Sequence, residues 1–261
     1  MASGFDAQVR GQVVVVTGAG RGIGRALAER FAAAGARLVL SDVDSGAVAA
    51  VAGDLGAQAV IADLSTAAGV AHVVAVAEGI GPVEVWVGNA GVPGPPGLAA
   101  RDAAWTATLE VNVLAHVRAA RALVPQWLER GRGRFVVTAS AAGLLTMPGA
   151  AAYTVTKHAA VAFAEWLSLT YGDRGVAVHC LCPQGVSTQM LDDLGALADA
   201  TRGDGTLSPT QVADALWEAM AQGSFLVLPH PEVARYYRNR AADTDRWLAG
   251  MRPWAAQYAQ D

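Results

Sequence analysis

Four consecutive valines, Val13 to Val16, make residues 12–17 a strand that is expected to be buried on both faces. Central strands of parallel sheets have this nearly continuous β-branched pattern because helices cover both of their faces. Similar apolar runs recur along the chain, and the stretches between them are long enough for crossover helices. These further strands are expected at residues 37–41, 57–62, 83–88, 134–139, 176–181 and 225–228.

The alternation predicts an α/β fold: a doubly wound, seven-stranded parallel sheet with helices on both faces, Rossmann-like and built as a single domain over residues 1–261. The sequence shows no linker, internal repeat or low-complexity tail that would divide it. Ser208, followed by a proline and by Gln211, has the pattern of a helix start. Pro125 lies inside the helical stretch 102–130 and is expected to kink it or to end its first part.

Charge and composition exclude several classes of function. A net charge of −4 gives no basic footprint for nucleic acid or an anionic membrane, so small molecules are the expected partners. Residues 135–156 carry no charge, but glycine, proline and hydroxyl side chains favour a buried strand and loop over a membrane span. Met1 to Arg10 lack the features of a secretory signal, so a cytoplasmic location is expected. Cys180 and Cys182 alternate on a strand, which disfavours a disulfide, and they are too few for zinc, so no metal site is expected.

A glycine-rich turn follows the first strand and precedes a helical stretch. Glycines let the backbone approach a diphosphate, and a helix N-terminus presents N–H groups to it. The strict Gly-x-Gly-x-x-Gly fingerprint is not met. Its third glycine would fall on Ile23 if the motif began at Gly18, and on Arg25 if it began at Gly20. A purely structural turn is the alternative. The predicted cofactor contacts here are Gly18, Arg21, Gly22, Ile23 and Gly24.

Acidic residues at the ends of the next two strands indicate which dinucleotide is bound. Asp42 lies 20 residues beyond Gly22, where a carboxylate accepts from the adenosine ribose hydroxyls and repels a 2′-phosphate. This favours NAD over NADP, although Arg21 could pair with a phosphate and Asp42 could be a capping or surface residue. Asp63, followed by Leu64, could contact the adenine or begin the next helix.

Tyr153 and Lys157 are four residues apart on a predicted helix, so their side chains emerge on one face. A tyrosine has a pKa of about 10 and is a poor base at neutral pH, but an adjacent ammonium lowers that pKa. Lys157 is the only lysine in the sequence, which weakens the alternative of an ordinary surface lysine. Ser140 ends the fifth strand, where it could hydrogen-bond a substrate oxygen or simply form a turn.

Several segments together resemble the short-chain dehydrogenase/reductase family over essentially the whole chain. They are residues 17–24, Asn89-Ala90-Gly91, Asn112, Ser140, Tyr153-x-x-x-Lys157 and Pro183 to Thr188. The resemblance implies a catalytic tetrad in a homo-oligomer, a tetramer or a dimer. The tetrad is Asn112, Ser140, Tyr153 and Lys157, and the further cofactor contacts are Asn89, Ala90, Gly91, Tyr153, Lys157, Pro183, Val186 and Thr188.

The resemblance also implies a reaction, hydride transfer between a nicotinamide cofactor and an alcohol or carbonyl. In the oxidative direction Tyr153 would take the hydroxyl proton, and Lys157 would lower its pKa and bind the nicotinamide ribose. Ser140 would orient the substrate oxygen, and Asn112 would help to hold a water that relays the proton.

Two positions depart from the family's pattern. Gly88 stands where the family commonly has asparagine, directly before Asn89. Gln184 follows Pro183 where the family usually has glycine, and it is expected to alter the substrate pocket.

Apolar residues around the predicted site favour a hydrophobic secondary alcohol or ketone, with plain core packing as the alternative. They are Leu144, Leu145, Met147, Met190 and Leu191, and the expected substrate contacts are Ser140, Leu145, Met147, Tyr153, Gln184 and Met190. By resemblance, residues 188–207 form the substrate-binding loop, and their glycines, Gly203 among them, could make it a lid. Residues 231–261 are a C-terminal helical extension rich in aromatic residues, which could close the pocket, form an interface or simply pack.

Two other functions compete with this interpretation. An NADPH-dependent ketoreductase, such as a 3-oxoacyl carrier-protein reductase, is favoured by Arg21 but disfavoured by Asp42 and by the lack of a basic docking patch. A non-catalytic nucleotide-sensing module could share the fold, but it would not need the four catalytic residues together.

Overall fold

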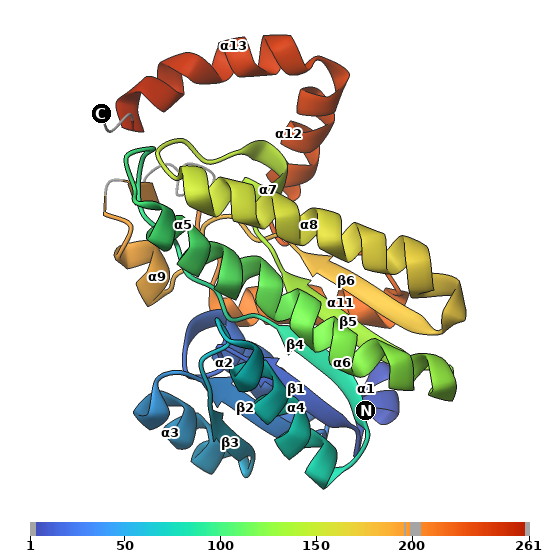
Figure 1. Ribbon diagram of the computed structural model, residues 1–261. Coiled ribbons are helices and arrows are strands. Elements are labelled where there is room, and N and C mark those ends of the chain that lie inside the picture. Colours follow the sequence, from blue (N-terminus) through green and yellow to red (C-terminus); the bar gives the residue numbers. More distant parts are fainter. Residues whose placement is uncertain (1–3, 196, 199–204, 259–261) are drawn as a thin grey trace.

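The computed structural model of the protein describes residues 4–195, 197–198 and 205–258 and contains a seven-stranded sheet. The strand order is β3-β2-β1-β4-β5-β6-β7, and each neighbouring pair is parallel. The predicted doubly wound α/β fold is therefore confirmed (Figure 1). The strands are β1 Val13–Thr17, β2 Arg37–Asp42, β3 Gln58–Ile61, β4 Val83–Gly88, β5 Gly133–Thr138, β6 Val176–Leu181 and β7 Leu226–Val227.

The valine run of β1 lies between two hydrophobic cores, one on each face of the sheet. Val13 and Val15 belong to one core, Val14 and Val16 belong to the other, and all four are fully buried. Successive side chains of a strand point to opposite faces, so a central strand needs apolar residues at every position. The alternation along β1 therefore explains why the sequence pattern predicted its place.

Helices cover both faces of the sheet. The core that contains Val13 is closed by α4, α6 and α8, and the core that contains Val14 is closed by α1, α2, α3 and α11. The helices are α1 Gly4–Val9, α2 Gly22–Ala33, α3 Ser45–Leu55, α4 Ala67–Ile80, α5 Asp102–Leu109, α6 Ala115–Arg130, α7 Ala142–Leu145, α8 Ala151–Tyr171, α9 Gln189–Asp192, α11 Pro209–Gln222, α12 Pro231–Ala242 and α13 Thr244–Ala255. Shorter turns are the π-helix Glu110–Leu114 and the 3-10 helices Gly172–Arg174 and Ala256–Tyr258. The predicted helix start at Ser208 is confirmed by a complete capping box.

The long helical stretch before β5 is interrupted at a different place from the one predicted. α6 continues through Pro125, and the departure from α geometry is the π-helix Glu110–Leu114. Two residues after Pro125, the fully buried Trp127 packs in the core and donates a hydrogen bond to the Val83 carbonyl at 2.7 Å. This packing stabilises the helix against the loss of one backbone hydrogen bond at proline.

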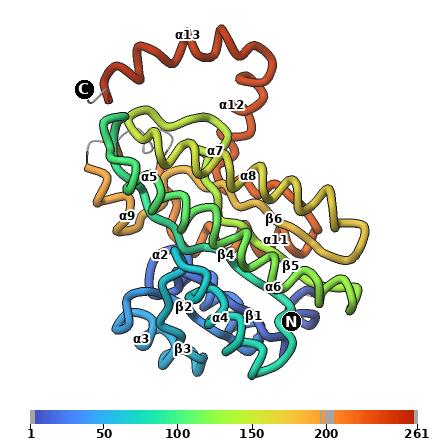
Figure 2. The backbone as a smooth tube through the Cα atoms, viewed as in Figure 1, coloured from blue at the N-terminus to red at the C-terminus, as the bar shows by residue number. Residues whose placement is uncertain are grey.

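Beyond the last strand the chain forms an arm of two helices. α12 leaves the sheet near α7, and α13 turns back across the same end of the molecule, passing over α7 (Figure 1, Figure 2). The carboxyl ends of the strands open toward this end, so the arm lies over the region in which sheets of this type bind ligands.

Cys180 and Cys182 are buried free thiols whose Sγ atoms lie 3.7 Å apart on β6. Within the described residues, no group of three or more His, Cys, Asp and Glu side chains is placed to hold a metal ion. None of the helices in the described part of the chain combines the length and the apolar character needed to span a membrane.

Candidate active site

A cavity of about 900 Å³ opens at the carboxyl ends of the strands. It brings together most of the residues that the sequence singled out. Those that line it are Gly18, Arg21, Gly22, Ile23, Asp42, Asp63, Leu64, Asn89, Ala90, Gly91, Ser140, Leu145, Met147, Tyr153, Lys157, Pro183, Gln184, Val186, Thr188 and Met190. Gly24, Asn112 and Leu144 lie behind the lining rather than in it.

The glycine turn forms one end of the cavity. Gly18 and Gly22 have φ values of 61° and 54°, the left-handed conformation that favours glycine. A Cβ at Gly18 would lie 2.9 Å from the Ala90 Cα, so the turn packs directly on the backbone that follows β4. A side chain at Gly24 would collide with the Gly18 carbonyl, so Gly24 permits close packing of α2, and it is not among the residues that line the cavity. The first turn of α2 lines the cavity and is suited to an anion such as a diphosphate.

The charged groups next to this turn are already paired. The Asp42 carboxylate accepts hydrogen bonds from the Gly20 N–H at 2.9 Å and from the Asp44 N–H at 3.1 Å. The Arg21 guanidinium donates to the Asp44 carboxylate at 2.7 Å and to the Gln189 side-chain oxygen at 2.6 Å. Arg21, which was expected to be able to pair with a 2′-phosphate, therefore forms an ion pair with Asp44, and Asp42 lines the cavity.

Asn89 joins the glycine turn to the end of β4. Its side-chain nitrogen donates to the carbonyls of Thr17 and Gly18 at 3.0 and 3.2 Å. The Thr17 hydroxyl oxygen accepts from the N–H groups of Asn89 and Ala90 at 2.9 and 3.0 Å. Asn89 thus lines the cavity while its amide holds the turn in place.

Asp63 lines the cavity as well, and its carboxylate accepts from the Ser65 N–H at 2.9 Å in the turn before α4.

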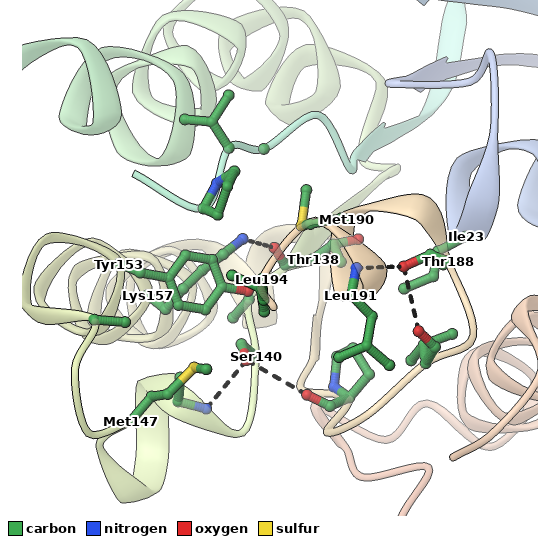
Figure 3. Close-up of a pocket in the computed structure, with 18 of the residues that line it drawn as sticks. Ile23, Thr138, Ser140, Met147, Tyr153, Lys157, Thr188, Met190, Leu191 and Leu194 are labelled. Atoms are coloured by element: carbon green, nitrogen blue, oxygen red, sulfur yellow. Dashed lines mark hydrogen bonds between the residues drawn. The ribbon is translucent and has the colours of Figure 1, made fainter. Parts of the chain in front are cut away.

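Tyr153 and Lys157 project from the first turns of α8 into the cavity, as Figure 3 shows. The Lys157 Nζ lies 5.6 Å from the centre of the Tyr153 ring and donates a hydrogen bond to the Thr138 carbonyl at 2.9 Å. Burial raises the pKa of Tyr153, a hydrogen bond with Ser140 acts in the opposite direction, and the Cys182 thiol adds to the increase. The expected lowering of the Tyr153 pKa by Lys157 is therefore wrong for the protein alone, because lost hydration of the phenol outweighs the favourable groups.

Lys157 is only 4 % exposed. Burial lowers the pKa of Lys157 to about 8, and the thiols of Cys182 and Cys180 act against this decrease. With a pKa of about 8 the ammonium is the main form at neutral pH, so a positive charge lies beside Tyr153. The Thr138 carbonyl that holds the ammonium was missed, because a backbone acceptor has no residue-type signal in a sequence.

Ser140 and Asn112 have different places in the site. Ser140 lines the cavity, and its hydroxyl accepts from the Ala142 N–H at 3.1 Å and donates to the Pro183 carbonyl at 3.5 Å. Asn112 lies in the π-helix, fully buried, and exchanges two hydrogen bonds of 2.9 Å with the backbone of Val92. It also donates to the Thr156 hydroxyl at 3.0 Å. The Asn112 side chain therefore fastens the segment after β4 to α8, one layer behind the cavity wall.

A buried histidine, His116, fills the space beside Gly88. A Cβ at Gly88 would collide with the His116 Nδ1, which explains why glycine stands where the family commonly has asparagine. His116 is 2 % exposed, and burial, with a smaller contribution from the charge of Lys157, lowers its pKa to about 3. It is therefore neutral at physiological pH. His116 was not predicted from the sequence, in which the available signal was the missing side chain at Gly88.

A second missed histidine, His230, holds the turn after β6. The Gln184 N–H donates to the His230 Nδ1 at 3.2 Å, so the proton of this ring is on Nε2, which donates to the Gly185 carbonyl at 3.0 Å. His230 is the N-cap residue of α12, so the base of the arm positions a turn that lines the cavity. Farther along, the Thr188 methyl group packs against the glycine turn, because a Cβ at Gly22 would lie 3.1 Å from it.

Apolar side chains form the other end of the cavity. Met147, Met190 and Leu191 line it as predicted, and Leu194 joins them (Figure 3). Leu145 lines it as predicted as well. Leu144 was expected there, but α7 turns its side chain into the core, where it is 2 % exposed. Of the predicted substrate-binding loop, α9 and Leu194 form a wall of the cavity, whereas Gly203 lies outside the described residues.

The C-terminal arm completes the lining. Tyr236 on α12 and three residues of α13 face the cavity from above it: Trp247, Met251 and Trp254. Met251 was not singled out from the sequence, although its spacing from the two tryptophans is that of one helix face.

Comparisons with known proteins indicate the family of the chain. Residues 12–198 match the short chain dehydrogenase family. The chain is 37 % identical over 254 residues to 1-deoxy-11-beta-hydroxypentalenate dehydrogenase of Streptomyces avermitilis, with 92 % of each protein covered. It is 34 % identical over 236 residues to estradiol 17-beta-dehydrogenase 11 of Rattus norvegicus, covering 87 % of this chain and 78 % of that protein. A solved short chain dehydrogenase/reductase from Burkholderia phymatum, in complex with NAD, is 34 % identical and superposes with a TM-score of 0.83 over 91 % of this chain and 95 % of that one.

Proposed function

The chain belongs to the short-chain dehydrogenase family and is an oxidoreductase acting on CH–OH groups, and from this premise we propose that it interconverts a hydrophobic secondary alcohol and its ketone with NAD. One observation carries the proposal. Tyr153, Ser140 and Lys157 meet in a cavity whose far end holds the glycine turn and Asp42. Two relatives are named for the dehydrogenation of a hydroxypentalenate and of estradiol, which supports an alcohol on an apolar molecule as the substrate.

The chemistry follows from the groups around Tyr153. NAD, when bound, supplies the hydride acceptor for the carbinol carbon. Tyr153, as the phenolate, takes the proton of the substrate hydroxyl, and as the phenol it returns that proton in the reductive direction. Ser140 hydrogen-bonds the substrate oxygen and holds it toward Tyr153. Lys157, held by the Thr138 carbonyl, places a positive charge where it stabilises the phenolate.

The pKa values divide these roles between the two directions. Because burial raises the pKa of Tyr153, the neutral phenol is its resting form and is ready to protonate a ketone oxygen. Oxidation requires the phenolate, so its rate is expected to rise with pH until Lys157 begins to lose its own proton at a pH of about 8.

The preference for NAD is supported by Asp42 and by the pairing of Arg21. Asp42 lines the cavity at the end of β2, and the Arg21 guanidinium that would attract a 2′-phosphate is bound to Asp44. Initial rates with NAD and NADP at equal concentration test this preference. We expect NAD to be favoured by about 10-fold or more, the discrimination that one charged contact supplies. Equal or faster turnover with NADP would instead support the NADPH-dependent ketoreductase.

A panel of secondary alcohols, followed by the absorbance of the reduced cofactor, tests the reaction itself. Apolar secondary alcohols are expected to be oxidised faster than alcohols that carry a carboxylate, because the apolar end of the cavity is lined by leucine and methionine. Tight NAD binding without turnover of any alcohol or ketone would support a nucleotide-sensing module.

We also propose that the protein forms a homo-oligomer, as the family resemblance implies. Apolar side chains on α8 support this, since Val155, Trp166 and Leu169 are 49 %, 52 % and 88 % exposed. Light scattering of the purified protein should give the mass of a dimer or a tetramer, and a monomer at micromolar concentration would contradict the proposal.

A further inference from the structure

We propose that the arm α12–α13 is the distal wall of the substrate pocket and selects secondary alcohols whose apolar body is broad and rigid, with more than one ring. The inference rests on the proposed function, because it assigns the occupant of the same cavity. It concerns a part of the chain beyond the segment that matches the family, which ends at residue 198.

The first observation is the inner face of α13. Trp247, Met251 and Trp254 are spaced by four and three residues, so they lie on one face of the helix, and all three line the cavity. The neighbouring Leu248 points away and is 47 % exposed. None of the residues of α13, all of which are described, is buried. Two tryptophans and a methionine that only partly pack against the protein leave apolar surface facing the cavity, and an apolar ligand would cover it.

The second observation is that the arm is fastened at its base. Val233 of α12 is fully buried in the core, and His230 binds the backbone of Gly185. Arg240, near the end of α12, donates to the Leu144 carbonyl of α7 and contacts His158 of α8 at 3.4 Å. α13 therefore starts from a defined position next to the elements that carry Ser140 and Tyr153.

The third observation is that the residues after α13 pack against the loop that contains Met147, next to Tyr153. Tyr258 packs with Tyr153 and Leu194 on the small apolar cluster around Met147. It also meets Trp254 edge to face, with ring centres 5.5 Å apart. At the other end of α13, Tyr236 lies 6.2 Å from Trp247, ring centre to ring centre. α13 is thus held at both ends and spans the cavity, which suits a wall better than a free tail.

The shape and charge of this end of the cavity indicate the class of substrate. Apolar groups face it from three sides: Met147 from the loop before α8, Leu191 and Leu194 from α9 and the residues after it, and the inner face of α13. A body that contacts all three walls is broad rather than a single extended chain. The charged lining residue next to Leu194 is Asp193, so a substrate bearing a carboxylate or phosphate would meet an acidic group there.

The test compares the inner and outer faces of α13. Trp247→Ala and Trp254→Ala are measured with Leu248→Ala as the control, using NAD and three secondary alcohols: a bicyclic decalin alcohol, a straight-chain decanol and a butanol. We expect kcat/KM of the bicyclic alcohol to fall about 10- to 100-fold in the tryptophan variants. Loss of the contacts that one methylene group makes in a hydrophobic pocket lowers kcat/KM by a similar factor. The butanol, which is too small to reach α13, should change by less than about 2-fold, and Leu248→Ala should leave all three values unchanged.

The outcomes separate this inference from the proposed function. Failure of the unmodified protein to oxidise any of the alcohols contradicts the proposed function. The role of α13 is overturned if the unmodified protein oxidises all three alcohols and the tryptophan variants lose activity equally toward all three, or lose none. An equal loss for the straight-chain decanol overturns the multi-ring substrate. Calorimetric titration of the NAD-bound protein with the bicyclic ketone, a pair that cannot react, gives a second readout, and weaker binding in Trp247→Ala but not in Leu248→Ala is the expected result.

Discussion

The two ends of the cavity are built in different ways. The cofactor end is formed by backbone atoms that lie close together, since the glycine turn packs on the Ala90 backbone and the Asp42 carboxylate binds the Gly20 N–H. The substrate end is formed by side chains from α7 and α8, α9, and α13, which are far apart in the sequence. At the first end a Cβ at Gly18 or Gly24 has no space, whereas at the second end the walls are large side chains around an open volume.

The two constructions separate the part of the site that performs the reaction from the part that selects the substrate. Backbone geometry tolerates few substitutions, so the cofactor end is suited to a reaction that many relatives share. Walls made of side chains change in size without moving the backbone, so they adjust specificity. We therefore expect substitutions near the cofactor and catalytic residues to abolish function or stability, and those at the substrate end to change selectivity.

The largest effect is expected where the two ends meet, at the catalytic phenol. Tyr153→Phe removes the group that exchanges a proton with the substrate, so turnover should fall by about 10³-fold or more. NADH binding, measured by calorimetry, should change by less than about 3-fold, because the glycine turn and Asp42 are untouched. Nearly normal turnover would remove Tyr153 from the mechanism, and a parallel loss of NADH binding would show that the two ends are not separable.

The next effect concerns the packing behind the site. Gly88→Ala places a Cβ against the His116 ring, and we expect the free energy of unfolding to fall by about 1–3 kcal/mol in urea denaturation. Gly53→Ala is the control, because a Cβ at that position on α3 meets nothing within 4 Å. Adding His116→Ala should recover much of the loss if the collision causes it. Equal stability of the Gly88→Ala and Gly53→Ala proteins would contradict the role of His116.

A smaller effect is expected on the choice of dinucleotide. Asp42→Ala removes a charged acceptor at the cofactor end, and the ratio of kcat/KM for NAD to that for NADP should fall by about 10-fold. Asp44→Ala frees the Arg21 guanidinium and should improve turnover with NADP while leaving that with NAD nearly unchanged. An unchanged ratio in Asp42→Ala would show that the carboxylate holds the Gly20 and Asp44 N–H groups and does not select the cofactor.

The smallest effect is a pH dependence of stability at Lys157. The folded pKa is about 8 and the ordinary value is 10.5, so between these values the unfolded chain binds the extra proton. Stability due to this group therefore rises with pH, and the unfolding free energy of the natural chain relative to Lys157→Met should increase by about 1.5 kcal/mol from about pH 8 to about pH 9.5. The Cys180 thiol, whose pKa is raised well above 9 chiefly by the Cys182 hydrogen bond and by burial, stays protonated in both folded proteins, and its titration in the unfolded chains is common to both. A constant difference over this range would falsify the lowered pKa.

The strands and most of the cavity lining could be predicted because they depend on local patterns. The alternation of apolar runs with helical stretches follows from the side-chain geometry of each element, and residues at strand ends gather at one edge of a parallel sheet. The helix does not end at Pro125 because the packing of Trp127, a tertiary contact, outweighs the local preference of proline to end a helix. Leu144 was misplaced because the direction of α7 determines whether a leucine faces core or cavity.

The order of the elements, the glycine turn and the identity of the groups around Tyr153 follow from local patterns along the chain. The tertiary structure sets the balance between these groups: Arg21 is paired with Asp44, and burial outweighs the Ser140 hydrogen bond in the pKa of Tyr153. It also decided that His116 fills the space of a missing side chain and that α13 spans the cavity. The physical reason is that hydration, ion pairing and packing depend on distances between residues far apart in the chain, and a linear pattern does not contain those distances.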